Sequence, residues 1–160
     1  MKTTILSLAS VLLISLSACG QSGKDVPVPV KSAFSQKFSG ATNVRWGMEN
    51  DKEWEAEFKM GGRKYSANFD NAGNWMETEY QVTASELPAA VKATLDIESA
   101  GAKIKLSEVT ETNDGKAFEF VINKGEDQTE LIIDNSGKVT KKEQLKEEDE
   151  NDEGEEKEGN

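Results

Sequence analysis

The side chains that could do chemistry in this 160-residue chain are almost all carboxylates. The sequence contains 30 Asp and Glu residues, one cysteine at position 19 and no histidine. The lack of histidine excludes Ser-His-Asp triads, Cys-His pairs and most transition-metal sites. No G-x-x-x-x-G-K-[S/T] phosphate-binding loop is present either. The chemistry that remains is acid–base catalysis by carboxylates, which requires two of them to converge in a pocket.

Two groups of acidic residues have spacings that invite a chemical interpretation. Glu55 and Glu57 lie on one face of an expected strand, and we interpret them as a solvated strand face. Asp70 and Asp134 each begin an Asp-Asn-x-Gly sequence, which could suggest calcium binding. The ligand order of an EF-hand loop is absent, and Asp, Asn and Gly are the residues that tight turns need. We therefore predict turns at these positions, with no metal site and no cofactor.

The single cysteine follows a short apolar segment near the start of the chain. Residues 5–16 are apolar apart from small residues, and Lys2 precedes them. Such a segment is too short to span a bilayer and is typical of a secretion signal. Leu, Ser and Ala at 16–18, followed by Cys19, resemble a lipobox. The resemblance implies that residues 1–18 are a lipoprotein signal peptide and that Cys19 carries the lipid. The alternative, a free cysteine after a plain signal peptide, is disfavoured because an exposed thiol is reactive in an oxidising compartment.

Both ends of the mature chain are predicted to lack a packed structure. Residues 19–25 are predicted to form a flexible polar tether, and residues 146–160, without an apolar side chain, a disordered acidic tail. No Asp follows Cys19 directly, so the usual inner-membrane retention signal is absent. The predicted location is therefore the periplasmic side of the outer membrane. The net charge of −11 disfavours nucleic acid and favours basic partners.

An internal repeat is the most informative pattern in the chain. The sequence F-D-N-A-G-N at 69–74 is echoed by I-D-N-S-G-K at 133–138, an offset of 64 residues (133 minus 69). Upstream the offset falls to 61, where Val30 and Phe34 match Val91 and Leu95. The repeat predicts two copies, residues 26–82 and 83–145.

Each copy has the pattern of a helix followed by strands. Apolar residues recur at helical spacing at Val30, Phe34 and Phe38 in the first copy. Alternating apolar and polar residues typical of half-buried strands follow in both copies, and short links favour antiparallel pairing. We predict an α+β fold of two tandem repeats, each a helix followed by a four-stranded antiparallel meander, with the helices packed on one face of the sheet. Whether the two copies share one continuous sheet is left open.

Aromatic residues are the candidate binding residues. Core packing against the first helix explains at least Trp54, whereas the alternative places one or two of the three tryptophans on the open sheet face, where Trp and Tyr are common interface anchors. The predicted binding face contains Trp46, Trp54, Trp75, Tyr65 and Tyr80.

The order of these motifs resembles the PepSY-like, β-lactamase-inhibitor-like domain of exported proteins of Gram-negative bacteria. The pattern is Val-x-x-x-Phe in a helix, Val44-x-Trp46, Trp54-x-Ala56-x-Phe58, Phe69-Asp70-x-x-Gly73-x-Trp75 and Glu86-Leu87-Pro88. The resemblance covers residues 26 to about 145. It implies two tandem α+β units with an extended sheet face, and it supplies no catalytic residues. The wider group includes protein inhibitors of β-lactamase, whose disulfides cannot form here because the domain has no cysteine.

The expected function is that of an exported lipoprotein without catalytic activity. Its PepSY-like module would bind or inhibit a protein, such as an exported hydrolase, through an open sheet face. The expected partners are a membrane, reached through the lipid on Cys19, and a protein, with no nucleic acid. A periplasmic module that binds a small ligand or a divalent cation is the alternative, and an enzyme that uses carboxylates alone is a third possibility.

Overall fold

A computed structural model describes residues 25–145 of the chain. The predicted signal peptide, Cys19, nearly all of the tether and the acidic tail lie outside the described residues. Within residues 25–145, no helix has the length and apolar character needed to cross a membrane. The elements in chain order are α1 (Val28–Lys37), β1 (Thr42–Asn50), β2 (Glu53–Met60), β3 (Arg63–Asp70), β4 (Trp75–Gln81), α2 (Ala89–Glu98), β5 (Lys103–Thr112), β6 (Gly115–Lys124), β7 (Asp127–Asp134) and β8 (Val139–Leu145).

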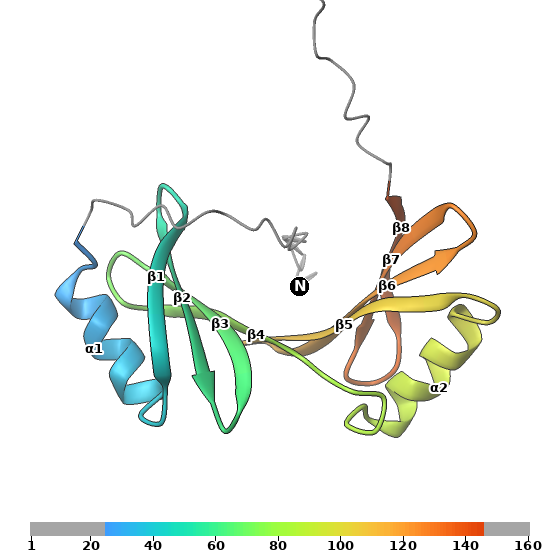
Figure 1. The fold of residues 1–160 in the computed structure, drawn as a ribbon, viewed down its shortest axis with the longest axis horizontal. Coiled ribbons are helices and arrows are strands. Elements are labelled where there is room, and N and C mark those ends of the chain that lie inside the picture. Colours follow the sequence, from blue (N-terminus) through green and yellow to red (C-terminus); the bar gives the residue numbers. More distant parts are fainter. Residues whose placement is uncertain (1–24, 146–160) are drawn as a thin grey trace, which may run out of the picture.

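All eight strands belong to one antiparallel sheet, in the order β1 to β8 (Figure 1). Most neighbours are joined by short turns, which explains their antiparallel pairing. The exception is the pair β4 and β5, which are separated in sequence by α2 yet lie side by side. Tyr80 lies opposite Val109 in this pair, and the sheet therefore runs without a break from one end to the other.

The predicted fold class is wrong. The structure is one eight-stranded sheet, mostly β, with only two ten-residue helices in its described part, and not two helix-plus-four-strand repeats. The physical reason lies at β4 and β5, because unpaired strand edges carry free N–H and C=O groups that gain by pairing with each other. Once these two edges pair, no boundary remains between two separate units. The periodicity of the sequence locates strands but does not say which edges meet.

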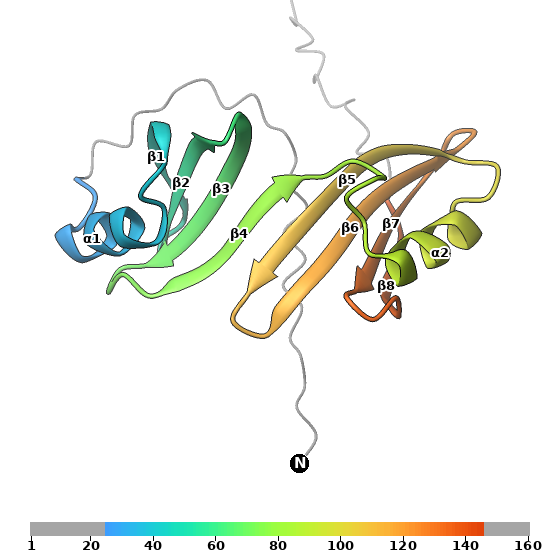
Figure 2. The same ribbon diagram turned by 90° about the horizontal axis from the view of Figure 1, so that it is seen from below.

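Both helices pack on the same face of this sheet (Figure 2). The registers show this, since Trp54 lies opposite Phe69 and Phe118 lies opposite Ile133, and all four side chains belong to helix-covered clusters. The first cluster packs α1 on β2 and β3 and consists of Val30, Phe34, Phe38, Trp54, Ala56, Phe58, Ala67 and Phe69. The second packs α2 on β5, β6 and β7 and consists of Leu87, Val91, Leu95, Val109, Phe118, Phe120, Ile122, Leu131 and Ile133.

Each helix begins against the turn that joins the last two strands of its half. A Cβ added to Gly73 would lie 2.7 Å from the carbonyl oxygen of Pro29, next to the start of α1. A Cβ added to Gly137 would lie 2.8 Å from the carbonyl oxygen of Ala90 in α2. Both glycines also have positive φ, of 87° and 88°. These two turns therefore need glycine for the backbone conformation and for the close approach of the helix.

The curvature of the sheet distinguishes its two faces. The helices lie on the outer side of the curve, and the helix-free face lies on the inner side between the two ends of the sheet (Figure 1). Successive side chains of a strand point to opposite faces, so every strand contributes to both. The polar residues that alternate with the core residues are thus brought together on the inner side.

Candidate binding surfaces on the two faces of the sheet

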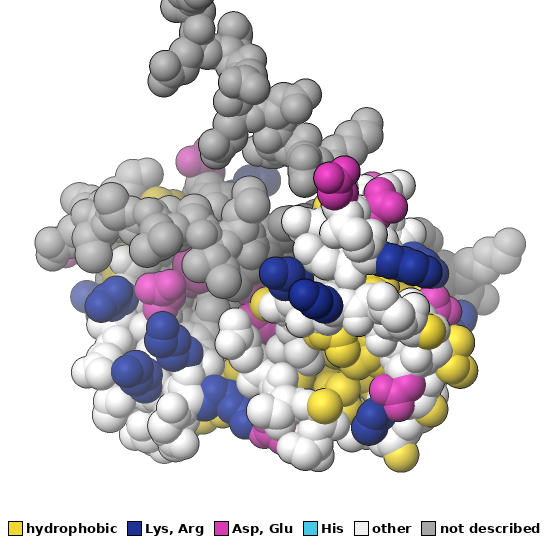
Figure 3. All heavy atoms as spheres, turned by 45° about the vertical axis from the view of Figure 1, so that its right-hand side comes forward, with side chains coloured by type: hydrophobic (Ala, Val, Ile, Leu, Met, Phe, Trp, Pro, Cys, Tyr) yellow, Lys and Arg dark blue, Asp and Glu magenta, His cyan; other side chains and the backbone are white. Residues whose placement is uncertain are grey.

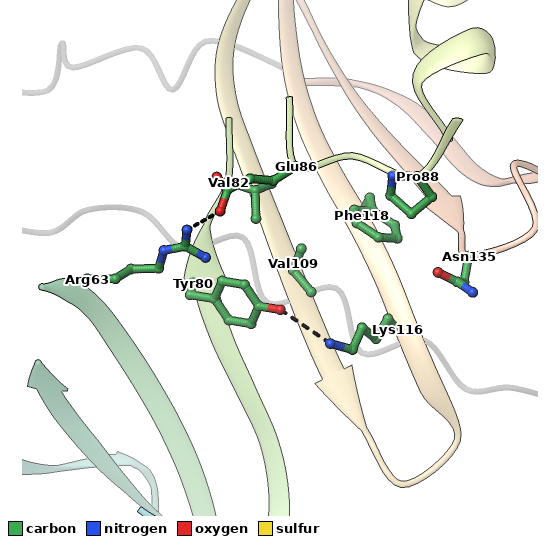
Figure 4. Close-up of a pocket in the computed structure, with 9 residues that line it drawn as sticks. All are labelled: Arg63, Tyr80, Val82, Glu86, Pro88, Val109, Lys116, Phe118 and Asn135. Carbon is green, nitrogen blue, oxygen red and sulfur yellow. Dashed lines mark hydrogen bonds and ion pairs between the residues drawn. The ribbon is translucent and has the colours of Figure 1, made fainter. Parts of the chain in front are cut away.

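A hollow of about 390 Å³ lies on the helix-bearing face between the two halves of the sheet. Figure 4 shows Tyr80 in the middle of it, with Arg63 and Lys116 on either side. Arg63 forms an ion pair with Glu86, and the Lys116 ammonium group lies 3.4 Å from the Tyr80 hydroxyl. The Thr83 amide and the Arg63 guanidinium hold the pKa of Glu86 down to about 2. The hollow is thus lined by the Tyr80 ring and by two cations, Arg63 and Lys116, that already contact other side chains of the protein.

A second hollow, of about 290 Å³, adjoins the first and also includes Tyr80. The Lys37 ammonium group stands 3.5 Å above the ring of Trp75, a close cation–π contact. Tyr65 packs between Phe58 and Tyr80, with ring centroids 5.4 Å and 5.1 Å away. These side chains pack against one another, so the aromatic rings of this hollow already have partners within the chain.

All five aromatic residues of the predicted binding face belong to the helix-bearing side. Trp54 is in the core with 3% of its surface exposed, and its indole N–H donates to Asn71 Oδ1 at 2.8 Å. Trp46 is half-buried against Phe34. The other three, Trp75, Tyr65 and Tyr80, line the two hollows. The structure places none of these five aromatic side chains on the helix-free face.

The exposed apolar side chains form a minor third feature. Figure 3 shows hydrophobic side chains at the surface on the side of the molecule that carries α2. Ile97 near the end of α2 is 75% exposed, and Ile104 on β5 is 46% exposed. Exposed apolar side chains are common on protein surfaces, and these carry no polar or charged group that would define a site.

The helix-free face is rich in glutamate. The predicted pair Glu55 and Glu57 on β2 does lie on this face, opposite Asn68 and Ser66 of β3. Four further glutamates from β4, β5 and β6 face the same side by register, and the six together are called the glutamate band: Glu55, Glu57, Glu77, Glu79, Glu108 and Glu119. Within residues 25–145, no ion pair involves any of these six carboxylates.

Partial burial raises the pKa of most carboxyl groups in the glutamate band. Burial, together with the nearby carboxylates of Glu77 and Glu108, raises the pKa of Glu79 to about 8. Burial and the charge of Glu130 raise the pKa of Glu119 to about 7. Burial likewise raises the pKa of Glu55, Glu77 and Glu108. Five of the six carboxylates therefore hold their protons to higher pH than a free glutamate does.

Two buried polar groups on the same face have free acceptor atoms. Asn68 is 6% exposed, and its side-chain N–H donates to Glu77 at 3.1 Å while Oδ1 receives no hydrogen bond. Glu130 is 1% exposed and binds the Lys141 ammonium group through Oε2 at 2.7 Å, but its Oε1 receives none. A buried acceptor without a donor costs free energy, so a donor that reached either atom after neighbouring side chains moved aside would recover that cost.

Only part of this surface follows from the sequence. The alternation along one strand predicts that Glu55 and Glu57 share an exposed face, but it does not connect them with Glu77, Glu79 or Asn68. The available signal was the same in each case, two polar residues at alternate positions of one strand. Recognising the band also requires the order of the strands and the pairing of β4 with β5, which local periodicity does not contain.

The Asp-Asn-x-Gly segments form turns. Asp70 accepts hydrogen bonds from the backbone N–H groups of Ala72 and Asn74, both at 2.9 Å. Asp134 accepts from the backbone N–H groups of Ser136 and Lys138, at 2.9 Å and 3.1 Å. These bonds, with those from the Asn74 and Ser136 side chains, lower the pKa of both carboxyl groups. In the part of the chain that the structure describes, no three acidic, cysteine or histidine side chains are grouped to hold a metal ion.

Comparison with protein families identifies the domain. A family model described as "Putative beta-lactamase-inhibitor-like, PepSY-like" matches residues 52–141, more than half of the chain. The chain belongs to the PepSY-like family. The predicted resemblance is confirmed. The match runs from β2 to β8 and includes all six residues of the glutamate band.

Several solved structures share the fold of this PepSY-like chain at low sequence identity. A BLIP-like protein from Bacteroides fragilis has 20% identity and a TM-score of 0.70, covering 81% of this chain and 94% of its own. A DUF2874 family protein from Bacteroides ovatus has 20% identity and a TM-score of 0.70, covering 76% and 89%. A protein from Bacteroides eggerthii described as one of the "putative periplasmic proteins" has 17% identity and a TM-score of 0.69, covering 76% and 90%. No curated protein matches the sequence significantly.

Proposed function

We propose that this protein is a lipid-anchored, non-catalytic binding module that engages a protein partner through the helix-free face of its sheet. The observation that carries the proposal is the division of the sheet into two unlike faces. One face is covered by α1 and α2 over both cores, and among the described residues no helix covers the other. A broad, polar and inward-curved sheet face of this kind can accept a convex protein surface.

The charge of the face supports a binding role. Natural proteins seldom leave several partly buried carboxylates together without cations, because each costs desolvation free energy. The six residues of the glutamate band have no ion pair within residues 25–145, and five of them have raised pKa values. An interface that supplies complementary charge would recover this cost and would also steer association.

The relatives of this chain support binding to another protein as its activity. The family description and the BLIP-like structure both refer to β-lactamase inhibitors, which act by binding a protein. By analogy the partner of this chain is an exported protein, such as a hydrolase, and the outcome is binding or inhibition. A shared fold supports this kind of role, but it does not identify the partner.

The proposed location is the cell envelope, with the lipid on Cys19 in the outer membrane and the domain in the periplasm. The lipobox-like residues 16–19 and the apolar segment before them support this location. A structure of the same fold, from Bacteroides eggerthii, is described as periplasmic. The lipid would hold the domain near the membrane where exported partners pass.

The proposal is tested by blocking the helix-free face. Thr110 on β5 lies on this face opposite Glu79, and Asp96 lies at an exposed position on α2. Full-length protein carrying Thr110→Trp or Asp96→Trp would be expressed in its native host, cross-linked and purified, with circular dichroism confirming that each variant folds.

We expect wild type and Asp96→Trp to carry the same cross-linked protein and Thr110→Trp to lose it, since a Trp side chain at Thr110 obstructs the centre of the face. Retention of that protein by a folded Thr110→Trp variant would contradict the proposal.

A further inference from the structure

Four residues of the glutamate band form a compact arrangement on the first half of the helix-free face. Glu55 and Glu57 lie on β2, and Glu77 and Glu79 lie on β4, with β3 between them. The register gives two parallel rows, Glu55–Asn68–Glu77 and Glu57–Ser66–Glu79. These four glutamates are called the carboxylate square.

The spacing of the square follows from the geometry of a sheet. Alternate residues of a strand are about 6.8 Å apart, and two strand spacings make about 9.6 Å. A side chain that enters between β2 and β4 therefore meets carboxylates on both sides. The two β3 residues between these strands, Ser66 and Asn68, are hydrogen-bonded to the square. Ser66 donates to Glu55 at 2.6 Å, and Asn68 donates to Glu77 at 3.1 Å.

A second observation, independent of the charge, indicates that the square receives a hydrogen-bond donor. Asn68 lies between Glu55 and Glu77 in one row of the square and is 94% buried (100 minus 6), and its Oδ1 has no donor among the described residues. A carbonyl oxygen beside four carboxylates is suited to N–H donors that carry positive charge. Lysine and arginine side chains supply such donors.

The cations that β1 to β3 place on this face stand at the edge of the square. Arg45 on β1 lies opposite Glu57, and Lys59 and Lys64 lie opposite each other where β2 and β3 meet their turn. None of the three forms an ion pair with the square. The four carboxylates of the square are therefore left without an ion-pair partner among the described residues.

The spacing of the four carboxylates in the square favours a polypeptide over a metal ion as the ligand. A divalent cation needs several ligands within about 2.0–2.6 Å of one point, and in residues 25–145 no three acidic groups meet that way. Alternate side chains of an extended peptide project about 6.8 Å apart, which matches the distance between the carboxylates along β2 and β4. A basic segment in extended conformation can thus place successive Lys or Arg side chains against successive rows.

We propose that the carboxylate square binds lysine or arginine side chains of a basic segment of the protein partner, with Asn68 Oδ1 accepting one of their hydrogen bonds. This inference rests on the proposed function, in which the helix-free face binds a protein. It adds the chemistry of the partner surface and the residues that recognise it.

The acidity of the square agrees with such a ligand. Burial raises the pKa of Glu55, Glu77 and Glu79, in the last case to about 8. Glu77, Glu108 and Glu119 face Glu79 from its own strand, β5 and β6 and keep its pKa high, while Thr110 opposes this by donating a hydrogen bond. A cation that enters the square favours the ionised carboxylates, so its binding should release protons and tighten as the pH rises through 8.

The test uses a defined probe. Full-length protein in detergent would be titrated calorimetrically with a synthetic peptide of alternating Lys and Thr, and with a matched peptide of alternating Glu and Thr. At about pH 9, above the pKa of Glu79, the square variant Glu77→Gln/Glu79→Gln would be compared with Asp114→Asn/Glu126→Gln, which removes the same charge at exposed turn positions elsewhere.

The proposal expects the lysine peptide to bind wild type and the control variant alike, and the square variant roughly tenfold more weakly. Added salt should weaken this binding. Equal losses in both variants would show that only net charge matters, and binding weaker than about 1 mM to wild type would show that the square is no site. Either result overturns the inference.

The partner experiment separates this inference from the proposed function. If Thr110→Trp loses the cross-linked partner but the folded Glu77→Gln/Glu79→Gln variant retains it fully, the helix-free face binds a protein and the inference about basic side chains is wrong. If Thr110→Trp retains the partner, the proposed function itself fails.

Discussion

Gly73 lies against the carbonyl of Pro29, so close that a Cβ on Gly73 would be 2.7 Å from that oxygen. The contact ties the turn before β4 to the first turn of α1. In the second half of the sheet, a Cβ on Gly137 would likewise be 2.8 Å from the carbonyl oxygen of Ala90 in α2. The two helices are therefore fixed on the sheet by backbone contacts as well as by their apolar side chains.

The first prediction concerns this contact. Gly73→Ala and Gly137→Ala should each destabilise the domain by about 3 kcal/mol or more, because an alanine there has positive φ and also collides with the helix backbone. Gly101→Ala is the matched control, since Gly101 has φ of 76° but no atom within 4 Å of its added Cβ. It should cost about 1–2 kcal/mol. Chemical denaturation measures all three, and equal losses would show that the helix contact contributes nothing.

The second prediction separates two of the tryptophans. Trp54→Ala should destabilise the domain by about 3–5 kcal/mol, because Trp54 is 3% exposed and fills the first core. Trp75→Ala should cost about 1 kcal/mol, since Trp75 is only half-buried at the rim of the first core, beneath the exposed side chain of Lys37. Thermal unfolding of the two variants would check this order. A larger loss in the Trp75 variant would contradict the placement of these side chains.

The third prediction is a dependence of stability on pH. The folded state holds protons on Glu79 up to about pH 8 and on Glu119 up to about pH 7, whereas the unfolded chain loses them near 4.5. Stability should therefore fall as pH rises from about 4.5 to about 8. Asp70 and Asp134 have lowered pKa values, so their contribution is lost as pH falls below about 3.8.

The melting temperature measured from about pH 3 to about pH 9 should accordingly be highest near pH 4 to 5. Glu79→Gln/Glu119→Gln should flatten the decline on the alkaline side and raise the melting temperature at pH 8, since glutamine stays neutral. A decline that is as steep in this variant as in wild type would show that these two carboxyl groups are not its source.

The fourth prediction concerns the link between β4 and α2. Glu86 accepts hydrogen bonds from the Thr83 amide and hydroxyl, both at 2.9 Å, and pairs with Arg63. Glu86→Ala removes these bonds, so the amide of Thr83 should exchange its hydrogen faster, while core amides such as that of Phe120 keep their rates. Hydrogen–deuterium exchange resolved by residue measures this. Unchanged exchange at Thr83 would mean that Glu86 does not hold the link.

The sequence predicts the local elements of this fold better than its overall architecture. The alternation at Trp54, Ala56 and Phe58 predicts β2 and its buried face, and the structure buries all three. The pairing of Tyr80 with Val109 has no local pattern, because the two residues belong to strands on opposite sides of α2. Two repeats of a helix and four strands were therefore predicted with the pairing between the copies left open, and the structure has one continuous eight-stranded sheet.

The candidate site shows the same limit. Glu55 and Glu57 were correctly placed together on a polar strand face, because alternation along one strand is local information. Glu79 and Asn68 were missed because their proximity depends on strand order. The aromatic residues were predicted from their type alone, and type does not tell which face of a strand a tryptophan occupies. Trp54 is thus in the core, while Tyr80 lines a hollow on the helix-bearing side.

Position-specific cross-linking in cells tests the central claim, the use of the helix-free face, most directly. A photoreactive amino acid would replace Ala117, which lies beside Thr110 on the helix-free face, or Asp96 on α2 as the control. The account predicts that the full-length protein with the probe at Ala117 cross-links to one envelope protein and that the probe at Asp96 does not. Cross-links to that protein from Asp96 alone, or from neither position, would contradict it.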